Sequence, residues 1–409
     1  MPKLFDVAVG SGGAAGLVAA ISAARRGNSV VVCERMPHLG KKILVTGGGR
    51  CNLTNEDLGP EAFTSGSRGL VAAVFGRFGK EDIRRFFKGL GLETHSEDGR
   101  VFPATNQASS VLKVLELEVR RLGVAVEAGF EVSRVERVGA SFILGATGGR
   151  KIGARSVIVA GGGKSYPALG SNGSAYGLAE GFGHRIVLPV PSAVPVLVKD
   201  KTCHLLQGQK VRARATSVIG GNAAQAADGE ILFTQYGLSG TAVLDVSESL
   251  SIAINREEKT NAAIVLDLVP FMSKEGLVAE FSRRMKGGWA DADLAAGILP
   301  EKFGPVVREL VSEGNREPGS AARALASALK EKRFSVQGTR GWNEAEFTCG
   351  GVDAREVDPR TLESKLRKGF YLAGEVLDVQ GGRGGFNLAW AWASGFVAGL
   401  QVHDHLRPR

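Results

Sequence analysis

The chain has 409 residues, 44% of them hydrophobic and 23% charged, which is the composition of an ordinary globular protein with room for two or three domains. Its formal net charge of +9 comes from dispersed lysines and arginines without a basic block, which favours a solvated basic surface over a nucleic-acid partner. The four scattered cysteines have no CxxC spacing, which argues against a zinc site, a dithiol couple or a disulfide scaffold and indicates a reducing, cytoplasmic compartment.

The N-terminal segment, MPKLFDVAVGSGGAAGLVAAISAARRG, has an early lysine and a long run of small apolar residues, as a signal peptide does. Asp6 lies where the apolar segment should begin, however, and glycines interrupt it, so we interpret the segment as mature structure. No other run approaches the ~20 apolar residues of a membrane span, so no membrane partner is expected. The sequence carries no signal for a particular oligomeric state.

The same segment predicts a strand, a glycine turn, a helix and a second strand that ends in an acid. Phe5 to Val9 has a buried-strand pattern, GSGGAAG follows, and small residues from Leu17 to Arg26 predict a helix before the strand SVVVCE, which ends at Glu34. In dinucleotide-binding units the glycines let backbone pass close to a pyrophosphate, the helix N-terminus presents free N–H groups, and the acid accepts hydrogen bonds from ribose hydroxyls. We therefore predict a dinucleotide site here.

Two registers of the GxGxxG fingerprint fit this turn. In one, Ala15 stands in the third glycine position; in the other, Gly16 stands there and Ser11 replaces the first glycine. We favour the register that ends at Gly16, because helix and sheet pack closely at the third position.

The C-terminal stretch indicates which dinucleotide binds. An apolar strand, Phe370 to Ala373, runs into Gly374 and Glu375, and a glycine-rich loop and a helix follow. In flavoproteins of the glutathione-reductase type, such a strand returns to the first domain, its acid holds the ribityl chain of FAD, and the next helix starts beneath the flavin ring. We interpret Val157 to Gly170 as the closing strand and loop of this domain, so NAD(P)H would visit the flavin cleft only transiently, as an electron donor.

Five unusual motifs are spread along nearly the whole chain: GKKILVTGGGRCNLTN, GGGKSYPALGSNGSAYGLAEGFGH, LFTQYGLSG, CGGVDAREVDPRTLESK and GFYLAGEVLDVQGGRGGFNLAWAWASG. Together they resemble the BaiN-like, or aminoacetone oxidase, family of FAD-dependent oxidoreductases. The resemblance implies an α/β fold, in which a glutathione-reductase-type Rossmann FAD domain is interrupted by an inserted β-barrel with a small helical subdomain.

We divide the chain accordingly into the first part of the FAD domain (1–191), the barrel (192–272), the helical subdomain (273–333), a return strand of the barrel (334–349) and the second part of the FAD domain (350–409). The strand-like runs of the insert are VPVLVK, KVRARATSVI, EILFT, TAVLDVS and AAIVLDLVP. From about Ser273 the hydrophobic residues recur at helical spacing, and a strand-like pattern returns at RFSVQG.

The resemblance places Lys41 to Asn55 under and beside the pyrophosphate and ring of the flavin, where Gly47 to Gly49 let backbone approach a flat ring system. The residues expected to hold FAD are Ser11, Gly12, Gly13, Ala14, Ala15, Gly16, Glu34, Arg35, Lys42, Gly48, Gly49, Arg50, Cys51, Asn52, Ala160, Gly161, Gly162, Gly374, Glu375, Asp378, Gly384, Gly385, Phe386 and Asn387. Binding should be noncovalent, because no histidine or cysteine stands in a recognisable flavinylation motif.

The candidates for a catalytic role are Arg50, Cys51 and Arg383. Arg50 and Asn52 can donate hydrogen bonds to flavin or substrate, and Arg383 either adds positive charge near the flavin or faces solvent. Cys51 is a tempting catalytic thiol, but we favour a small buried hydrophobe near the ring, because no resolving cysteine or flanking base is visible.

The loop GGRGGFN, residues 381–387, precedes a helix predicted from about Leu388 through Val397. The backbone N–H groups of Gly385, Phe386 and Asn387 should be the unpaired donors of its first turn. A helix N-terminus aimed at N1 and C2=O of the flavin would offset the negative charge that two-electron reduction leaves there.

The favoured function is hydride transfer between a small organic substrate and FAD. Two modes are open: an oxidase, whose flavin is reoxidised by oxygen, and a reductase fed by NAD(P)H. Two other classes are an RNA-modifying flavoprotein, because related folds act on tRNA and the chain is basic, and a flavin-binding protein without turnover.

Overall fold

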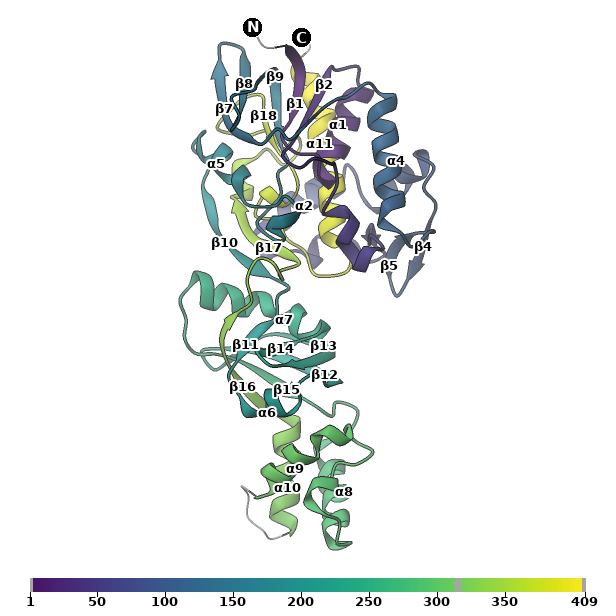
Figure 1. The fold of residues 1–409 in the computed structure, drawn as a ribbon, viewed down its shortest axis with the longest axis vertical. Helices are drawn as coiled ribbons and strands as arrows, with labels where there is room; N and C mark the ends of the chain where they lie inside the picture. The colour runs from purple at the N-terminus through teal and green to yellow at the C-terminus, as the bar shows by residue number, and fades with distance from the viewer. Residues whose placement is uncertain (1–2, 313–317, 407–409) are drawn as a thin grey trace. The chain divides into compact units, whose positions relative to one another are not determined.

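The structure is a computed structural model that describes residues 3–312 and 318–406. The chain divides into two compact units, one formed by Met1–Pro189 together with Phe347–Arg409 and the other by Val190–Glu346. The second unit is therefore an insertion between two parts of the first (Figure 1).

A seven-stranded sheet forms the centre of the first unit, with the strand order β6-β2-β1-β9-β8-β7 and with β18 paired to β9. Its strands are β1 (Leu4–Val9), β2 (Val30–Glu34), β6 (Ala125–Ala128), β7 (Val132–Val138), β8 (Ser141–Ala146), β9 (Lys151–Val159) and β18 (Phe370–Leu372). The pairs of β1 with β2 and β9, of β2 with β6 and of β18 with β9 are parallel, whereas β7 and β8 extend the sheet antiparallel from β9. The apolar runs of β1 and β2 suit parallel strands that are covered on both faces.

Two helices rich in small residues pack against each other beside this sheet: α1 (Ala14–Arg25) and α11 (Phe386–Leu406) (Figure 1). A Cβ atom at Gly395 would lie 2.2 Å from the backbone oxygen of Ala15, and one at Gly399 would lie 2.2 Å from that of Ala19. Glycine at these two positions therefore lets the two backbones approach closely. This contact brings the last helix of the chain to the first.

The other elements outside the barrel are α2 (Arg68–Phe75), α3 (Lys80–Gly89), α4 (Ala108–Arg121), α5 (Ser174–Glu180), β3 (Thr54–Asn55), β4 (Thr94–Glu97), β5 (Arg100–Pro103), β10 (Ile186–Ser192) and β17 (Phe347–Val352). The strands β3, β5 and β4 form a small antiparallel sheet, and β10 pairs with β17. Helix α3 buries Ile83, Phe86 and Phe87, and the ring of Phe87 meets Trp392 of α11 edge-on.

In the second unit, six strands close into a barrel with the order β11-β14-β13-β12-β15-β16. The strands and short helix of this barrel region are β11 (Val196–Val198), α6 (Lys201–Leu205), β12 (Lys210–Ile219), β13 (Asn222–Thr234), β14 (Gly237–Ser239), β15 (Ala262–Asp267) and β16 (Lys332–Thr339). Along β12, Val211, Ala213 and Ala215 are buried and the residues before each are exposed, as in a strand with one face on the core. Between β15 and β16 the chain forms α8 (Lys274–Lys286), α9 (Gly304–Ser312) and α10 (Pro318–Lys330).

One predicted strand of the insert is wrong. The run TAVLDVS begins α7 (Thr241–Ser251), whose buried residues Ala242, Val243, Val246 and Leu250 recur at helical spacing. A short apolar run fits a strand or a buried helix equally well, and the helical period becomes clear only when the residues after the run are counted.

The predicted α/β fold is otherwise confirmed, with a Rossmann domain interrupted by a closed barrel, and helices α8, α9 and α10 lie in the chain between the barrel strands β15 and β16. Helix α1 begins at Ala14, three residues earlier than predicted, and α11 begins at Phe386 and continues well beyond Val397.

Candidate flavin site

The glycine turn between β1 and α1 forms the first wall of the site. Gly13 is the N-cap of α1 in an extended conformation, and neither a side-chain cap nor a first-turn acid occupies this helix end. A Cβ atom at Gly16 would lie 1.9 Å from the backbone oxygen of Ser11, which is the close packing that the register ending at Gly16 requires. The N–H groups and the positive end of α1, whose first turn contains Ala14 and Ala15, can therefore receive a phosphate.

Glu34 lies at the end of β2, and its carboxylate points toward the glycine turn between β1 and α1. Its Oε2 accepts hydrogen bonds from the backbone N–H of Gly12 (2.7 Å) and from the hydroxyl of Ser11 (3.3 Å), and its Oε1 accepts one from the N–H of Met36 (2.8 Å). A carboxylate accepts about four hydrogen bonds. Glu34 is 6% exposed and keeps capacity for a ribose hydroxyl.

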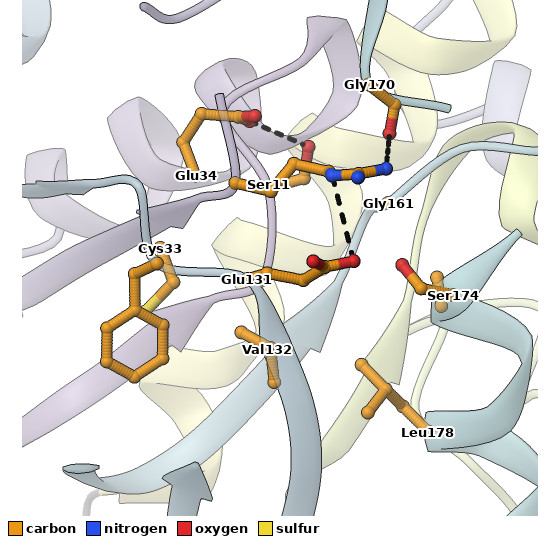
Figure 2. Close-up of a pocket in the computed structure, with 13 residues that line it drawn as sticks. Ser11, Cys33, Glu34, Glu131, Val132, Gly161, Gly170, Ser174 and Leu178 are labelled. Carbon is orange, nitrogen blue, oxygen red and sulfur yellow. Dashed lines mark hydrogen bonds and ion pairs between the residues drawn. The ribbon is translucent and has the colours of Figure 1, made fainter. Parts of the chain in front are cut away.

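A pocket opens beside Glu34 (Figure 2). It is lined by Gly10, Ser11, Cys33, Glu34, Arg35, Phe130, Glu131, Val132, Gly161, Gly170, Ser174, Ala175 and Leu178. Arg35 joins two sides of it, because its guanidinium donates to the backbone oxygen of Gly170 (3.3 Å) and its Nε lies 3.7 Å from Glu131.

Sequence reasoning placed Ser11, Glu34, Arg35 and Gly161 at this site but missed the wall formed by residues 130–132 and by Gly170. Residues 130–132 follow β6 and enter β7, and no motif marks them. The pairing of β6 beside β2 is the feature that would have pointed to them, since it brings the end of β6 next to Glu34.

Glu375 gathers a second group of polar residues from distant parts of the chain. Its Oε2 lies 2.9 Å from Nζ of Lys42, and its Oε1 accepts a hydrogen bond from the backbone N–H of Thr348 (2.8 Å). Lys42 also donates to the hydroxyl of Ser165 (2.7 Å), and the N–H of Gly163 donates to Glu375 (3.3 Å). The structure thus brings together Lys42 and Glu375, both predicted, with Ser165 and Thr348, which the sequence did not single out.

These contacts lie beside the loop that follows β9, in which Ala160 is buried and Gly161 and Gly162 are half-buried. Gly374 precedes Glu375 with its N–H bonded to the hydroxyl of Ser394 on α11 (2.9 Å). The N–H of Asp378, farther along, donates to the backbone oxygen of Val352.

The segment Lys41 to Asn55 enters the site through a short 3₁₀ stretch, Ile43–Gly49. Gly47, Gly48 and Gly49 all have positive φ (57°, 67° and 87°), a run that side chains would strongly disfavour. Leu44 and Val45 on this stretch are 40% and 45% exposed. The loop therefore presents bare backbone and two apolar side chains on its surface.

Arg50 is engaged within the protein. Its guanidinium donates to both carboxylate oxygens of Glu97 (3.0 and 2.7 Å) and to Oδ1 of Asn106, and it stacks over the ring of Phe102 at 3.9 Å. The hydrogen bond to Glu97 raises the pKa of Arg50 above its ordinary value. Arg50 thus ties the loop to the β4–β5 hairpin, whereas the sequence suggested a donor to flavin or substrate.

Cys51 follows with a positive φ of 60° and no exposed surface. Burial raises the pKa of its thiol to about 12, so the thiolate needed for nucleophilic attack is scarce at neutral pH. This observation favours the interpretation of Cys51 as a small buried hydrophobe.

The loop before α11 is held by the side chain of Asn387. Its Oδ1 accepts from the N–H of Gly381 (2.9 Å), and its Nδ2 donates to the backbone oxygens of Gly381 (2.9 Å) and Gly382 (3.2 Å). Arg383 is half-buried in this loop. Because α11 begins at Phe386, the first-turn N–H groups lie next to Gly384 and Gly385, and they have no acceptor within the helix.

These residues fit FAD. The helix ends of α1 and α11, the carboxylates of Glu34 and Glu375 and the pocket beside β2 supply the donors and acceptors that a dinucleotide and a flavin need. The buried Oδ1 of Asn52 and Oγ1 of Thr54 have no hydrogen-bond partner, and Oδ1 of Asn52 and the backbone of Thr54 lie against Gly385, just before α11. Buried polar atoms without a partner are rare in proteins and suit a site that receives a polar group.

The described residues offer neither a cluster of metal ligands nor a helix suited to crossing a membrane. Within residues 3–312 and 318–406, no three histidine, cysteine, aspartate or glutamate side chains are grouped so that they could hold a metal ion. Over the same described residues, no helix combines the length and the apolar character that crossing a membrane requires.

Solved structures of similar fold include two 3-ketosteroid dehydrogenases in complex with steroids. The 3-ketosteroid-delta4-(5alpha)-dehydrogenase from Rhodococcus jostii has a TM-score of 0.51 at 14% identity and covers 98% of this chain and 97% of its own. The 3-ketosteroid delta1-dehydrogenase from Sterolibacterium denitrificans has a TM-score of 0.51 at 15% identity and covers 98% of this chain and 99% of its own. At 14% and 15% sequence identity, the similarity to these two structures shows a shared fold and nothing more.

Sequence relatives extend over the full length. The 3-dehydro-bile acid delta(4,6)-reductase of Clostridium scindens is 36% identical over 397 residues, which cover 95% of this chain and 96% of that protein. The ribosomal RNA dihydrouridine synthase of Haemophilus influenzae is 30% identical over 411 residues, or 97% of this chain and 98% of that protein. The profile described as HI0933-like protein Rossmann domain matches residues 5–401, which confirms the predicted resemblance. The chain therefore belongs to the HI0933-like family of FAD-dependent oxidoreductases.

Proposed function

We propose that the protein reduces a carbon–carbon double bond conjugated with a carbonyl group in a small organic substrate, with FAD as the hydride carrier. The observation that carries the proposal is the pair of full-length relatives named as a 3-dehydro-bile acid delta(4,6)-reductase and a ribosomal RNA dihydrouridine synthase. The substrates in these two names are dissimilar, but both reactions saturate a double bond conjugated with a carbonyl. The shared chemistry is a better guide to this chain than either substrate.

When bound, FAD supplies a hydride at N5 of its ring. The residues of this chain would hold and orient it: the N-terminus of α1 would receive the pyrophosphate, Glu34 would accept a hydrogen bond from a ribose hydroxyl, Glu375 with Lys42 would bind the ribityl chain, and the start of α11 would serve the pyrimidine end of the ring. The N-terminus of α11 would supply positive potential there, which would offset negative charge on the bound cofactor.

Binding is proposed to be noncovalent, since Cys51 is buried with a protonated thiol and Cys33 is buried with its pKa raised to about 12, chiefly by desolvation. NAD(P)H is proposed as a transient electron donor. Precipitation of the holoprotein with acid should release all of its yellow colour.

The test is anaerobic titration of the purified holoprotein with NADH, NADPH and a panel of amines and hydroxy acids. The absorbance of the flavin is recorded at each step. A reductase should bleach with a nicotinamide donor and stay yellow with the amines. Bleaching by an amine alone, with peroxide formed once oxygen is admitted, would establish an oxidase and overturn the proposal. A flavin that no donor reduces would point to binding without turnover.

One observation keeps RNA as a second candidate substrate. The first unit carries 32 lysines and arginines against 23 aspartates and glutamates, whereas Val190–Glu346 carries 19 of each, so the whole net charge of +9 belongs to the FAD-binding unit. Such asymmetry is typical of proteins that bind polyanions. Ribosomal RNA fragments should then bind with an affinity that falls steeply with salt, and an affinity independent of salt would remove this candidate.

A further inference from the structure

Two buried side-chain oxygens, on residues that approach the start of α11, lack a hydrogen-bond donor. They are Oδ1 of Asn52, a residue that is 8% exposed, and Oγ1 of Thr54, a residue with no exposed surface. Burying an acceptor without a donor costs free energy, so an orphaned oxygen of this kind in a native site calls for a partner that is not part of the chain.

The polar groups around these atoms are already used to fix the neighbouring backbone. Nδ2 of Asn55 donates to the backbone oxygen of Gly384 (2.9 Å), and the indole N–H of Trp392 donates to the backbone oxygen of Leu53 (3.1 Å). The amide of Asn387 holds Gly381 and Gly382. The amide oxygen of Asn52 is therefore spare in a region where side chains otherwise serve to position the loop.

Asn52 lies close to the start of α11, as its distance from Gly385 shows. A Cβ atom at Gly385 would lie 2.6 Å from Oδ1 of Asn52 and 2.7 Å from the backbone oxygen of Thr54. The spare acceptor consequently lies against the residue that immediately precedes α11, next to the first-turn N–H groups of that helix.

We infer that Oδ1 of Asn52 accepts the hydrogen bond of the flavin N3–H and thereby sets the position of the ring, an inference that rests on the proposed binding of FAD at this site. The pyrimidine edge of a flavin presents C2=O, N3–H and C4=O in that order, one donor between two acceptors. The start of α11 supplies donors suited to C2=O, and the adjacent acceptor on Asn52 suits the N3–H beside it. Asn52 is thus a positioning residue that acts through the ring, with no part in the transfer of hydride.

The experiment compares the wild-type holoprotein with Asn52→Leu, which keeps the size of the side chain and removes its amide. Ser156→Ala is the matched control, because Oγ of Ser156 is also buried without a partner but lies on β9 within the sheet. Each apoprotein is titrated with FAD by flavin fluorescence, and each holoprotein is loaded with ¹⁵N-labelled FAD to record the N3–H resonance and its exchange with solvent.

We expect Asn52→Leu to weaken FAD by roughly tenfold, to shift the N3–H resonance upfield and to speed its exchange, because a buried donor loses its acceptor. Ser156→Ala should leave all three unchanged. The inference is overturned if Asn52→Leu binds FAD within twofold of the wild-type affinity and its N3–H resonance does not move. If the Asn52→Leu apoprotein melts early, Asn52→Ala, which also lacks an acceptor, is measured and interpreted in the same way. A wild-type protein that does not bind FAD would instead contradict the proposed function.

Discussion

At the scale of single residues, the site depends on acceptors and donors fixed by backbone contacts. Glu34 is held by the N–H groups of Gly12 and Met36, so its carboxylate is oriented before a ligand arrives. Lys42 and Glu375 pair at 2.9 Å and are 24% and 20% exposed, so each neutralises the other's charge in a partly buried place. Arg50, by contrast, has a structural role, because it donates hydrogen bonds to Glu97 and Asn106 and so holds the loop in place.

Glu34→Ala should weaken FAD by about 1 to 3 kcal/mol, because the ribose loses a charged acceptor and the glycine turn loses the carboxylate that orients it. The measurement is fluorescence titration of the apoprotein with FAD. Glu136→Ala is the control, since this glutamate of β7, whose side chain is 42% exposed, pairs only with Arg134 among the interactions described for it. Unchanged affinity in Glu34→Ala would remove Glu34 from the site.

At the scale of elements, two contacts between helices decide where the site can form. The close approach of α11 to α1 at Gly395 and Gly399 holds the C-terminal helix against the N-terminal helix within the first unit. A partly buried ionic contact joins α1 to α4: Arg25 at the end of α1 donates twice to Oε1 of the buried Glu118 (2.9 and 2.7 Å), and the more exposed Arg121 pairs with the same carboxylate.

The Glu118 contact predicts a pH-dependent contribution to stability. Hydrogen bonds from Arg121 and then Arg25 lower the pKa of Glu118 to about 2, below its ordinary value of 4.5. Its stabilising effect is therefore fully present above pH 4.5 and is lost as the pH falls toward 2. Glu118→Gln should cost on the order of 1 to 3 kcal/mol of unfolding free energy at pH 7 and progressively less below pH 4.5.

Thermal melting of Glu118→Gln and wild type at pH 7 and pH 3 checks this. Glu116→Gln on the same helix serves as control, because Glu116 makes none of these bonds. An equal loss of melting temperature at both pH values would mean that packing, and not the charge of Glu118, joins α1 to α4.

Gly385→Val tests the loop before α11. At φ 100° a side chain is strained, and the new Cβ would collide with Asn52 and with the backbone of Thr54. The variant should lose FAD or bind it at least tenfold more weakly, whereas Gly382→Ala, where a Cβ meets nothing within 4 Å, should bind FAD normally. Retention of FAD by Gly385→Val in a fluorescence titration would show that this loop does not shape the flavin site.

At the scale of the whole molecule, the sequence predicted the parts whose pattern is local. The βαβ pattern from Phe5 to Glu34, the late strand predicted at Phe370 to Ala373 and the family motifs predicted the Rossmann domain and its inserted barrel. In the structure β1 pairs with β2, and β18 pairs with β9. What it could not predict depends on pairing across distance. The pocket wall at Glu131 requires β6 to pair with β2, and the engagement of Arg50 requires the β4–β5 hairpin, which no motif marks.

The most direct test of the proposed activity is anaerobic reoxidation of the reduced holoprotein. The flavin is reduced with dithionite or a nicotinamide donor, mixed with a 3-oxo-Δ4 steroid or with its saturated 3-oxo counterpart, and followed by absorbance. The conjugated ketone should restore the yellow oxidised flavin and yield one equivalent of saturated product per FAD, while the saturated ketone leaves the flavin reduced. A flavin that remains reduced with every conjugated carbonyl compound offered, uridine-containing RNA included, yet reoxidises at once in air, would contradict double-bond reduction and identify an oxidase.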